Sequence, residues 1–422
     1  MGKNKEALKY RSITISCFVG IFVQALNSNL TPLLFITLMN MYGLSYVHLG
    51  LLMGINFISQ VSADLLLSGI IDKLGFRKLA LPAIFFSGLG LVMFALSPSL
   101  FPSNIMTGFI LSTILFSFAG GLLEILLSPI INAIPNDNKA TAMTLMHSFY
   151  AWGQVATVII TTLCLFLIGK ENWQYIALGW AVVPVIAFFM FYSSLYPPLL
   201  PISKQEKVRK TLFSPFYIIA LLAIFFGGST EVVMASWASS FMEKGLALSK
   251  VTGDLLGMCG FAAFMGLGRL IHSIFGEKMD MSRLIYISAL TAFVCYLAAA
   301  FSPVSSIVII AVIICGLASS LLWPGTLLLT AERYPFAGAW IFAILAAFGD
   351  SGAAIGNIFT GYAVSLSTDS KLSLFFSQWM DISSEQASLR IGILFSAIFP
   401  LMTFVTHYLL YKKGKSSQTD LR

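Results

Sequence analysis

Twelve long apolar stretches divide the 422-residue chain, and they limit its fold more than any other feature of the sequence. A helix that crosses a lipid bilayer needs about 20 mainly apolar residues. Stretches of this kind run over residues 12–39, 48–71, 79–98, 105–134, 141–169, 174–195, 214–241, 251–275, 284–302, 306–331, 337–366 and 387–411. The sequence therefore predicts an all-α membrane protein with twelve transmembrane helices.

The composition excludes the main alternatives to a helical membrane protein. Charged residues make up 10% of the chain and hydrophobic residues 58%, whereas an ordinary soluble domain has roughly 25% charged residues. Such a chain cannot be a soluble multi-domain enzyme, a secreted disulfide scaffold or a disordered chain. A membrane β-barrel would alternate polar and apolar residues in short segments. The cysteines and histidines stand singly, so neither disulfides nor a metal site is expected.

Lysine and arginine indicate the orientation of the chain. If the N-terminus lies in the cytoplasm, most of the 25 basic residues fall on the cytoplasmic side of the predicted helices. Cytoplasmic loops of membrane proteins carry such an excess, so both termini are expected in the cytoplasm. The compact loops and the lack of a transit peptide favour the plasma membrane. The net charge of +7 does not indicate a nucleic-acid partner, because the basic residues are spread over many loops.

The two halves of the chain look like copies of each other. The ten residues that begin at Asp64 align without a gap with the ten that begin at Arg269. Gly121 and Gly316 are each followed, eight residues later, by a proline. Parallel repeats of six helices are a known build of membrane transporters. The predicted organisation is an N-terminal six-helix half (1–195), a cytoplasmic middle loop (196–213), a C-terminal six-helix half (214–411) and a cytoplasmic tail (412–422).

The loop after the second stretch carries a motif. It reads Ser-Gly-Ile-Ile-Asp-Lys-Leu-Gly-Phe-Arg-Lys over residues 68–78. This resembles the signature loop of the major facilitator superfamily, Gly-x-x-x-Asp-Arg/Lys-x-Gly-x-Arg/Lys-Arg/Lys, although the first glycine falls on Ser68. The resemblance covers essentially the whole chain and implies two pseudo-symmetric six-helix halves that rock about a site at the membrane midplane.

The chemistry of this loop suggests a conformational latch. A glycine allows a tight turn, and an aspartate can pair with basic residues or with a helix N-terminus in one state of the transporter. The alternative is that the basic residues only anchor the loop to lipid headgroups. The candidate latch residues are Gly69, Asp72, Lys73, Gly75, Arg77 and Lys78.

Ionisable residues inside the apolar stretches are the first candidates for function, because a charge in the bilayer is costly. An apolar environment favours the neutral form of a carboxyl group, so uptake and release of a proton can follow a conformational change. Each residue could instead make a structural hydrogen bond or ion pair. The candidates for proton or cation coupling are Glu124, Asp64, Asp350 and His147. Arg269 is expected to pair with an acid or to contact an anionic substrate. Asp254 and Glu332 lie near helix ends, where contact with water is expected.

The fourth and fifth stretches suggest a substrate class. A Leu-Glu-x-x-x-x-Pro pattern around Glu124 is followed by residues 145–153, which contain His147, Phe149, Tyr150 and Gly153. This pair of patterns resembles the fucose permease-like group of sugar–proton symporters. The resemblance implies that Glu124 handles substrate and proton and that His147 and Tyr150 line the cavity. The first stretch departs from that group, because residues 26–29 contain no acid where the fucose permease has an essential aspartate.

Other polar and aromatic residues are candidates for substrate contacts. Amide groups suit the recognition of hydroxyl groups, and tryptophan can stack on the apolar face of a sugar ring. Hydrogen bonds between helices and ordinary packing are the alternatives. The candidate substrate-binding residues are Gln24, Asn27, Asn29, Tyr150, Gln154, Glu231, Trp237 and Trp323.

These features together predict a secondary active transporter. It would move a small polar solute, a sugar by the resemblance, through proton- or cation-coupled alternating access. The alternative is a proton-driven exporter of hydrophobic drugs or metabolites. No arrangement of nucleophile, metal ligands or nucleotide-binding loop indicates an enzyme. The expected partners are a small-molecule substrate and the lipid bilayer, with H⁺ or Na⁺ as the coupling ion, no cofactor, and a monomeric protein.

Overall fold

Twelve transmembrane helices form the scaffold of this protein. The computed structural model describes residues 9–67, 70–135, 139–198, 213–275, 279–334 and 339–419. These residues contain helices and no strand, and twelve of their helical segments are long and apolar enough to cross a membrane. The prediction of an all-α membrane fold with twelve spans is therefore confirmed.

The chain divides into two compact units. The first contains Met1–Tyr42 and Ile55–Ser203, and the second contains Gly43–Gly54 and Lys204–Arg422. The boundary after Ser203 falls inside the predicted middle loop, most of which (199–212) lies outside the described residues. The first turns of α4 (Tyr46–Leu67) belong to the second unit, a division inside one helix that the sequence repeat does not predict.

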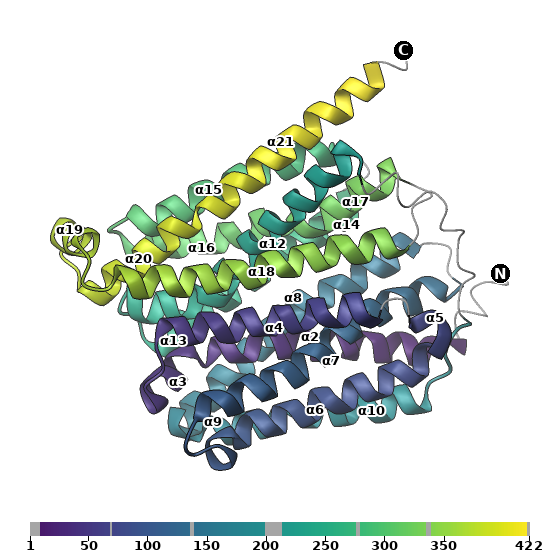
Figure 1. The fold of residues 1–422 in the computed structure, drawn as a ribbon, viewed down its shortest axis with the longest axis horizontal. Coiled ribbons are helices and arrows are strands. Elements are labelled where there is room, and N and C mark those ends of the chain that lie inside the picture. The colour runs from purple at the N-terminus through teal and green to yellow at the C-terminus, as the bar shows by residue number, and fades with distance from the viewer. Residues whose placement is uncertain are drawn as a thin grey trace. The chain divides into compact units, whose positions relative to one another are not determined.

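The first unit is a bundle of helices in which α2 packs against α7 and α8, and α6 packs against α7 and α10. α2 ends at Leu33, earlier than predicted and one residue after Pro32, which has no N–H to donate and whose ring crowds the preceding turn. A new helix then starts at Phe35. The helices are α2 (Arg11–Leu33), α3 (Phe35–Tyr42), the rest of α4, α5 (Ile71–Leu74), α6 (Phe76–Leu100), α7 (Ile105–Ala133), α8 (Lys139–Ile168), α9 (Trp173–Trp180) and α10 (Val182–Ser193) (Figure 1).

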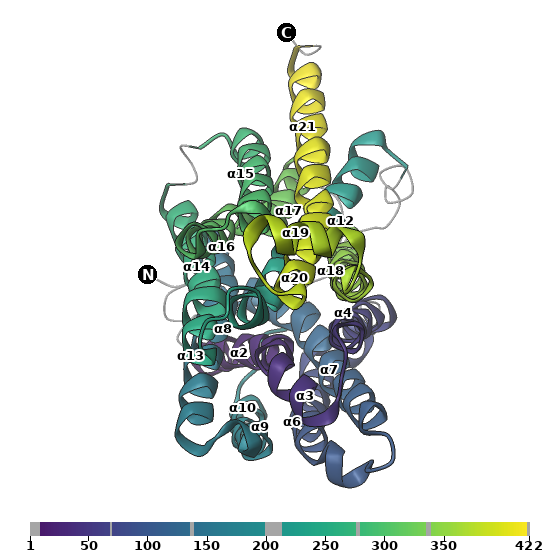
Figure 2. The same cartoon turned by 90° about the vertical axis from the view of Figure 1, so that its left-hand side faces the viewer.

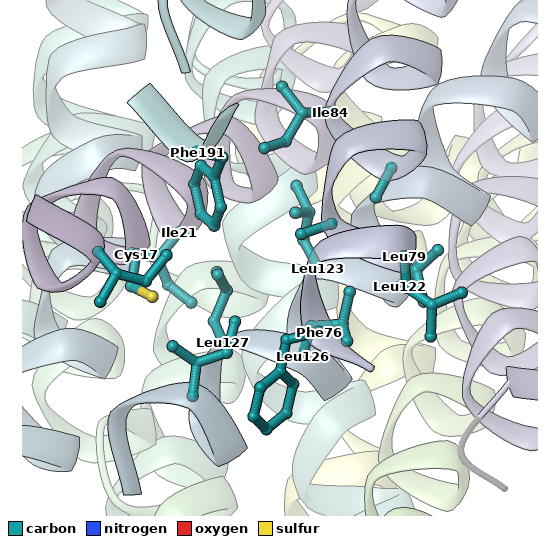
Figure 3. Close-up of a cluster of buried hydrophobic side chains, with 14 of the residues drawn as sticks. Cys17, Ile21, Phe76, Leu79, Ile84, Leu122, Leu123, Leu126, Leu127 and Phe191 are labelled. Atoms are coloured by element: carbon teal, nitrogen blue, oxygen red, sulfur yellow. The ribbon is translucent and has the colours of Figure 1, made fainter. Parts of the chain in front are cut away.

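An apolar cluster holds the first unit together. Leucines at positions 122, 123, 126 and 127 lie on one side of α7, since residues three and four apart share a helix face. Figure 3 shows them with Cys17 and Ile21 of α2, Phe76 of α6 and Phe191 of α10. Glu124 lies between the leucines in the sequence, and its carboxyl group accepts a hydrogen bond from Gln24 of α2. The leucines of α7 thus fix the helix while its carboxyl group contacts α2.

The second unit repeats this bundle design. Its helix α12 packs against α17, α18 and α21, while α15 packs against α16 and α21 (Figures 1 and 2). Short π-helical segments follow α12 (Phe241–Gly245) and α13 (Asp254–Cys259). The helices are α12 (Pro215–Ser240), α13 (Lys250–Gly253), α14 (Gly260–Phe275), α15 (Met281–Phe301), α16 (Ser305–Ser319), α17 (Leu322–Arg333), α18 (Ala339–Ser367), α19 (Lys371–Met380), α20 (Ser384–Ser396) and α21 (Ile398–Thr419).

The start of α4 lies directly on α18. A Cβ atom at Gly50 would come within 2.6 Å of the carbonyl oxygen of Asn357, and one at Gly361 within 2.6 Å of the carbonyl oxygen of Tyr46. The Tyr46 hydroxyl donates a hydrogen bond of 2.8 Å to Glu385. The absence of side chains at these glycines therefore allows the two helix backbones to approach closely, as small residues do in membrane bundles.

Candidate functional site

A buried polar stripe on α2 connects the helices of the first unit. The amide nitrogen of Asn27 donates to Ser87 Oγ of α6 at 2.7 Å and to the carbonyl oxygen of Phe116 of α7 at 3.0 Å. The Ser87 hydroxyl donates to Asn27 Oδ1 at 3.0 Å. The side chain of Asn27 thus links α2 to α6 and α7 by hydrogen bonds. Of the two roles considered for this residue, substrate contact or helix–helix hydrogen bonding, the structure shows the second.

Amide groups of α4 extend the same network. Gln60 donates to Asn56 Oδ1 at 2.7 Å, and Asn56 donates to the backbone carbonyl of Asn27 at 3.1 Å. Both amides are buried. Asn56 is absent from the predicted site, although its spacing of four residues from Gln60 in an apolar stretch places both amides on one helix face and was a usable signal.

Glu124 and Gln24 form the central contact of the site. The amide nitrogen of Gln24 on α2 donates to Glu124 Oε2 on α7 at 2.5 Å. A carboxyl oxygen accepts an N–H whether the group is ionised or protonated. This pair therefore tolerates both charge states of Glu124, as a residue that carries a proton through a transport cycle must.

Asp64 on α4 is the second acid predicted for the site in this unit. Its side chain is 0% exposed, and neither of its oxygens has a hydrogen-bond partner among the described residues. Gly121, three residues before Glu124, lies against Gln60, four residues before Asp64. The structure thus puts the predicted residues Glu124 and Asp64 on two helices of this unit that pack closely together, with Gln24 bonded to Glu124.

The predicted residues of α8 contact different helices: Tyr150 lies next to α2, and His147 lies next to α7. Asn29 of α2 donates to the backbone of Ala25 at 2.7 Å, and its nitrogen lies 3.5 Å from the hydroxyl oxygen of Tyr150. His147 Nε2 lies 3.3 Å from Ser128 Oγ of α7. Gln154 is buried. Among the described side chains of α8, Tyr150 thus contacts Asn29 of the polar stripe on α2.

An ion pair occupies the second unit. Arg269 of α14 donates to Glu231 of α12 at 3.0 Å and, through Nε, to the carbonyl oxygen of Ser320 at 3.2 Å. Both side chains are almost buried, at 12% and 10% exposure. Of the two roles predicted for Arg269, the structure shows pairing with an acid.

The remaining candidates of the second unit are packed between helices. Trp237 is buried; its indole N–H donates to Asn357 Oδ1 at 3.1 Å, and its ring lies 6.2 Å from that of Tyr46. The ring of Trp323 fills the space beside Gly228, where a Cβ atom would lie 3.1 Å away. Asp350 is buried in α18 and has an interaction partner. Both tryptophans thus serve packing in this structure.

A second cluster of buried charges surrounds Asp254, a residue for which contact with water was predicted. Lys250 Nζ is 2.5 Å from Asp254 Oδ1, 3.1 Å from Ser239 Oγ and 4.0 Å from Glu243 Oε2. Asp254 and Lys250 are both buried. The expectation for Asp254 was wrong because the π-helical segment that starts there packs against α12. The spacing of four residues between Lys250 and Asp254 was the missed signal.

The signature loop is described in part. Gly75 has a φ of +83°, a left-handed conformation that glycine adopts without strain. Arg77 donates to the carbonyl oxygen of Tyr192 at 2.6 Å, and Lys78 is exposed. Gly69 and the side chains of Asp72 and Lys73 lie outside the described residues. The latch therefore stays a prediction.

Among described residues, no group of three or more His, Cys, Asp or Glu is placed to hold a metal ion.

Gly121 sets the distance between α4 and α7, and we expect Gly121→Ala to destabilise the protein. A Cβ atom there would lie 2.7 Å from the Cα atom of Gln60, too close for the two helices to keep their positions. Glycine to alanine within a helix otherwise stabilises by about 1 kcal/mol. The control is Gly179→Ala in α9, where a Cβ atom meets nothing within 4 Å. Thermal unfolding in detergent measures both, and equal stability of the two variants would refute the close packing.

Comparisons with known proteins show which family and which solved structures this chain resembles. The sequence profile of the Major Facilitator Superfamily matches residues 17–357. No curated protein sequence matches the chain. Among solved structures, a bacterial homologue of the human lysosomal transporter Spinster, inward-facing and unoccupied, has a TM-score of 0.75 at 15% identity and covers 96% of this chain and 97% of its own.

Two further solved structures are sugar–proton symporters. A D-xylose–proton symporter has a TM-score of 0.74 at 14% identity, covering 92% of this chain and 96% of its own. The fucose:proton symporter FucP of E. coli has a TM-score of 0.64 at 14% identity, covering 95% of this chain and 99% of its own. At these identities the likeness is one of fold.

Proposed function

Because the chain belongs to the major facilitator superfamily, we propose that it imports a small polar solute, a sugar, together with a proton. The family and the fold are those of membrane transporters. The observation that carries the proposal is the contact between Glu124 and Gln24. It puts a carboxyl group that can exist in two charge states against the buried amide of Gln24 on α2, the helix that also carries Asn27 of the amide network.

The proposed cycle uses this carboxyl group as the proton carrier. Glu124 takes a proton on the outer side while the solute binds, and the neutral form can then be buried because the cost of a charge inside the membrane is removed. The site next opens to the cytoplasm, where solute and proton leave. Asp64, Asp350 and His147 are further candidates for ion coupling.

The sugar assignment rests on the chemistry of the amides. Gln24 and Asn29 each use an amide N–H inside the protein, and no described residue donates to their carbonyl oxygens. Carbonyl oxygens accept hydrogen bonds from hydroxyl groups. Two structural neighbours are sugar–proton symporters, which supports the same substrate class. Tyr150, close to Asn29, would add a hydroxyl group to the site.

The remaining expectations are part of this proposal. We place both termini in the cytoplasm and the protein in the plasma membrane as a monomer, and we assign the loop of residues 69–78 as the latch between conformations. H⁺ is the proposed coupling ion and Na⁺ the alternative.

A thermal-shift screen tests the substrate class. A ligand that binds only the folded protein raises its stability by RT ln(1 + [L]/Kd), or about 2.7 kcal/mol at a hundredfold excess over Kd. We expect D-xylose, L-fucose or another monosaccharide to raise the unfolding temperature of the wild type, and Gln24→Ala to remove the effect. Stabilisation by lipophilic cations alone would instead identify an exporter of hydrophobic compounds.

A further inference from the structure

Asp64 differs from every other polar side chain on its stretch of α4. Asn56 and Gln60 are hydrogen-bonded to each other, and the Ser59 hydroxyl donates to the carbonyl oxygen of Ile55 at 2.7 Å. Asp64 lies one turn after Gln60 and is 0% exposed, yet neither carboxyl oxygen accepts a hydrogen bond from the described residues. A carboxylate has room for about four donors, so all of its binding capacity is unused.

A carboxyl group in this position needs a cation. An ionised carboxylate that is buried without a partner costs several kcal/mol, and proteins avoid the cost by pairing the group or neutralising it. Two other buried acids of this protein follow that rule: Glu231 is paired with Arg269, and Asp254 with Lys250. In contrast, no lysine, arginine or histidine among the described residues forms an ion pair with Asp64.

Glu124 on α7 is an acid on the helix that packs against this part of α4. Gly121, three residues before Glu124, lies against Gln60, four residues before Asp64: a Cβ atom at Gly121 would come within 2.7 Å of the Cα atom of Gln60. The described contact of the Glu124 carboxyl group with α2 is the neutral amide of Gln24. Two neighbouring carboxylates repel each other, so ionisation of one favours a bound cation at the other. The two sites are therefore linked, and their occupancies change in separate steps.

We propose that Asp64 is a second binding site for a monovalent cation, a proton or Na⁺, linked to the Glu124 site. The proposal rests on the proposed function for the role of Glu124 and adds a second ion to the cycle. Both carboxyl groups must be neutralised before the unit can bury them together. Transport of one solute molecule then moves two cations, one at each acid. The cation at Asp64 is exchanged only in cycles in which Glu124 binds and releases its proton, so Asp64 alone does not drive accumulation.

Infrared spectroscopy tests the site without any solute. The reconstituted wild-type protein is prepared with ordinary and with ¹³C-labelled aspartate, so that a band of a protonated aspartate shifts while a glutamate band does not. Buffers of low and high pH are exchanged over the sample, and NaCl replaces KCl at constant pH. We expect a labelled carboxylic-acid band that disappears at high pH or on addition of Na⁺, and that is lost in Asp64→Asn.

The buffers distinguish the two ions. Loss of the band at high pH alone identifies a proton site, and loss on addition of Na⁺ at constant pH identifies a site that also takes Na⁺. A labelled band that responds to neither, or one that persists in Asp64→Asn, overturns the proposal. The wild-type spectra give this answer even if the variant does not fold.

Transport stoichiometry separates this inference from the proposed function. With the monosaccharide that stabilises the protein most as the probe, the cation-to-solute ratio is measured from reversal potentials in liposomes. We expect the ratio to fall from two in the wild type to one in Asp64→Asn, with accumulation still driven by the gradient. An unchanged ratio refutes the second site alone. Accumulation that survives Glu124→Gln refutes the role of Glu124 and leaves the infrared result for Asp64 standing.

Discussion

The Glu124→Gln variant is expected to lose all uphill accumulation of solute while it still exchanges labelled for unlabelled solute across the membrane. Glutamine has nearly the same shape as protonated glutamic acid, and its carbonyl oxygen can accept the same N–H from Gln24 that Glu124 accepts now. It cannot release a proton, so the inside and outside concentrations should become equal. The structural cost should be small, because no buried group loses its partner.

Accumulation is measured in liposomes with an imposed pH gradient, using the monosaccharide found by thermal shift. The matched control is Glu332→Gln, the same substitution at an exposed residue near the end of α17, which should accumulate solute as the wild type does. If Glu124→Gln accumulates solute as well as this control, then proton coupling through Glu124 is wrong.

The Arg269→Gln variant is expected to be the least stable single variant of the polar residues. Its guanidinium group pairs with Glu231 at 3.0 Å and both side chains are almost buried. Removal of one partner from such a pair leaves an uncompensated charge and typically costs about 3–5 kcal/mol. Chemical unfolding in detergent, followed by tryptophan fluorescence, measures the loss.

Two controls separate the ion pair from a general effect of the substitution. Arg283 and Asp280 form an exposed pair with a 3.9 Å separation and side chains 56% and 52% exposed, so Arg283→Gln should leave the stability nearly unchanged. The double variant Arg269→Met with Glu231→Leu removes both charges and should recover most of the stability. Equal losses for Arg269→Gln and Arg283→Gln would contradict the assigned role.

The number of transmembrane helices was predictable because hydrophobic length alone decides whether a helix can span a bilayer. Local breaks were harder to predict. Pro32 divides the first stretch into α2 and α3, and π-helical segments interrupt the helices after Ser240 and Gly253. The helix α19 forms within the junction that was predicted between the last two spans. Such breaks depend on single prolines and on packing partners, which a hydropathy pattern averages out.

The site was predictable in its residues and not in its contacts. Glu124 and Asp64 stand out because few acids occur inside the apolar stretches. Their partners were not readable, because helices that are apolar all round carry no amphipathic stripe that shows which side faces a neighbour. For this reason Gln24 was not assigned to Glu124 and Asn27 was not recognised as a link between three helices.

The most direct test of the whole account is the movement of protons when solute is added. Wild-type protein in lightly buffered liposomes, with no pH gradient, is given the stabilising monosaccharide outside, and external pH is recorded. Symport through Glu124 predicts that the outside becomes more alkaline, that the signal disappears with a protonophore, and that it is absent in Glu124→Gln. Acidification of the outside would show antiport, and no change of pH would show transport without protons; either result contradicts the account.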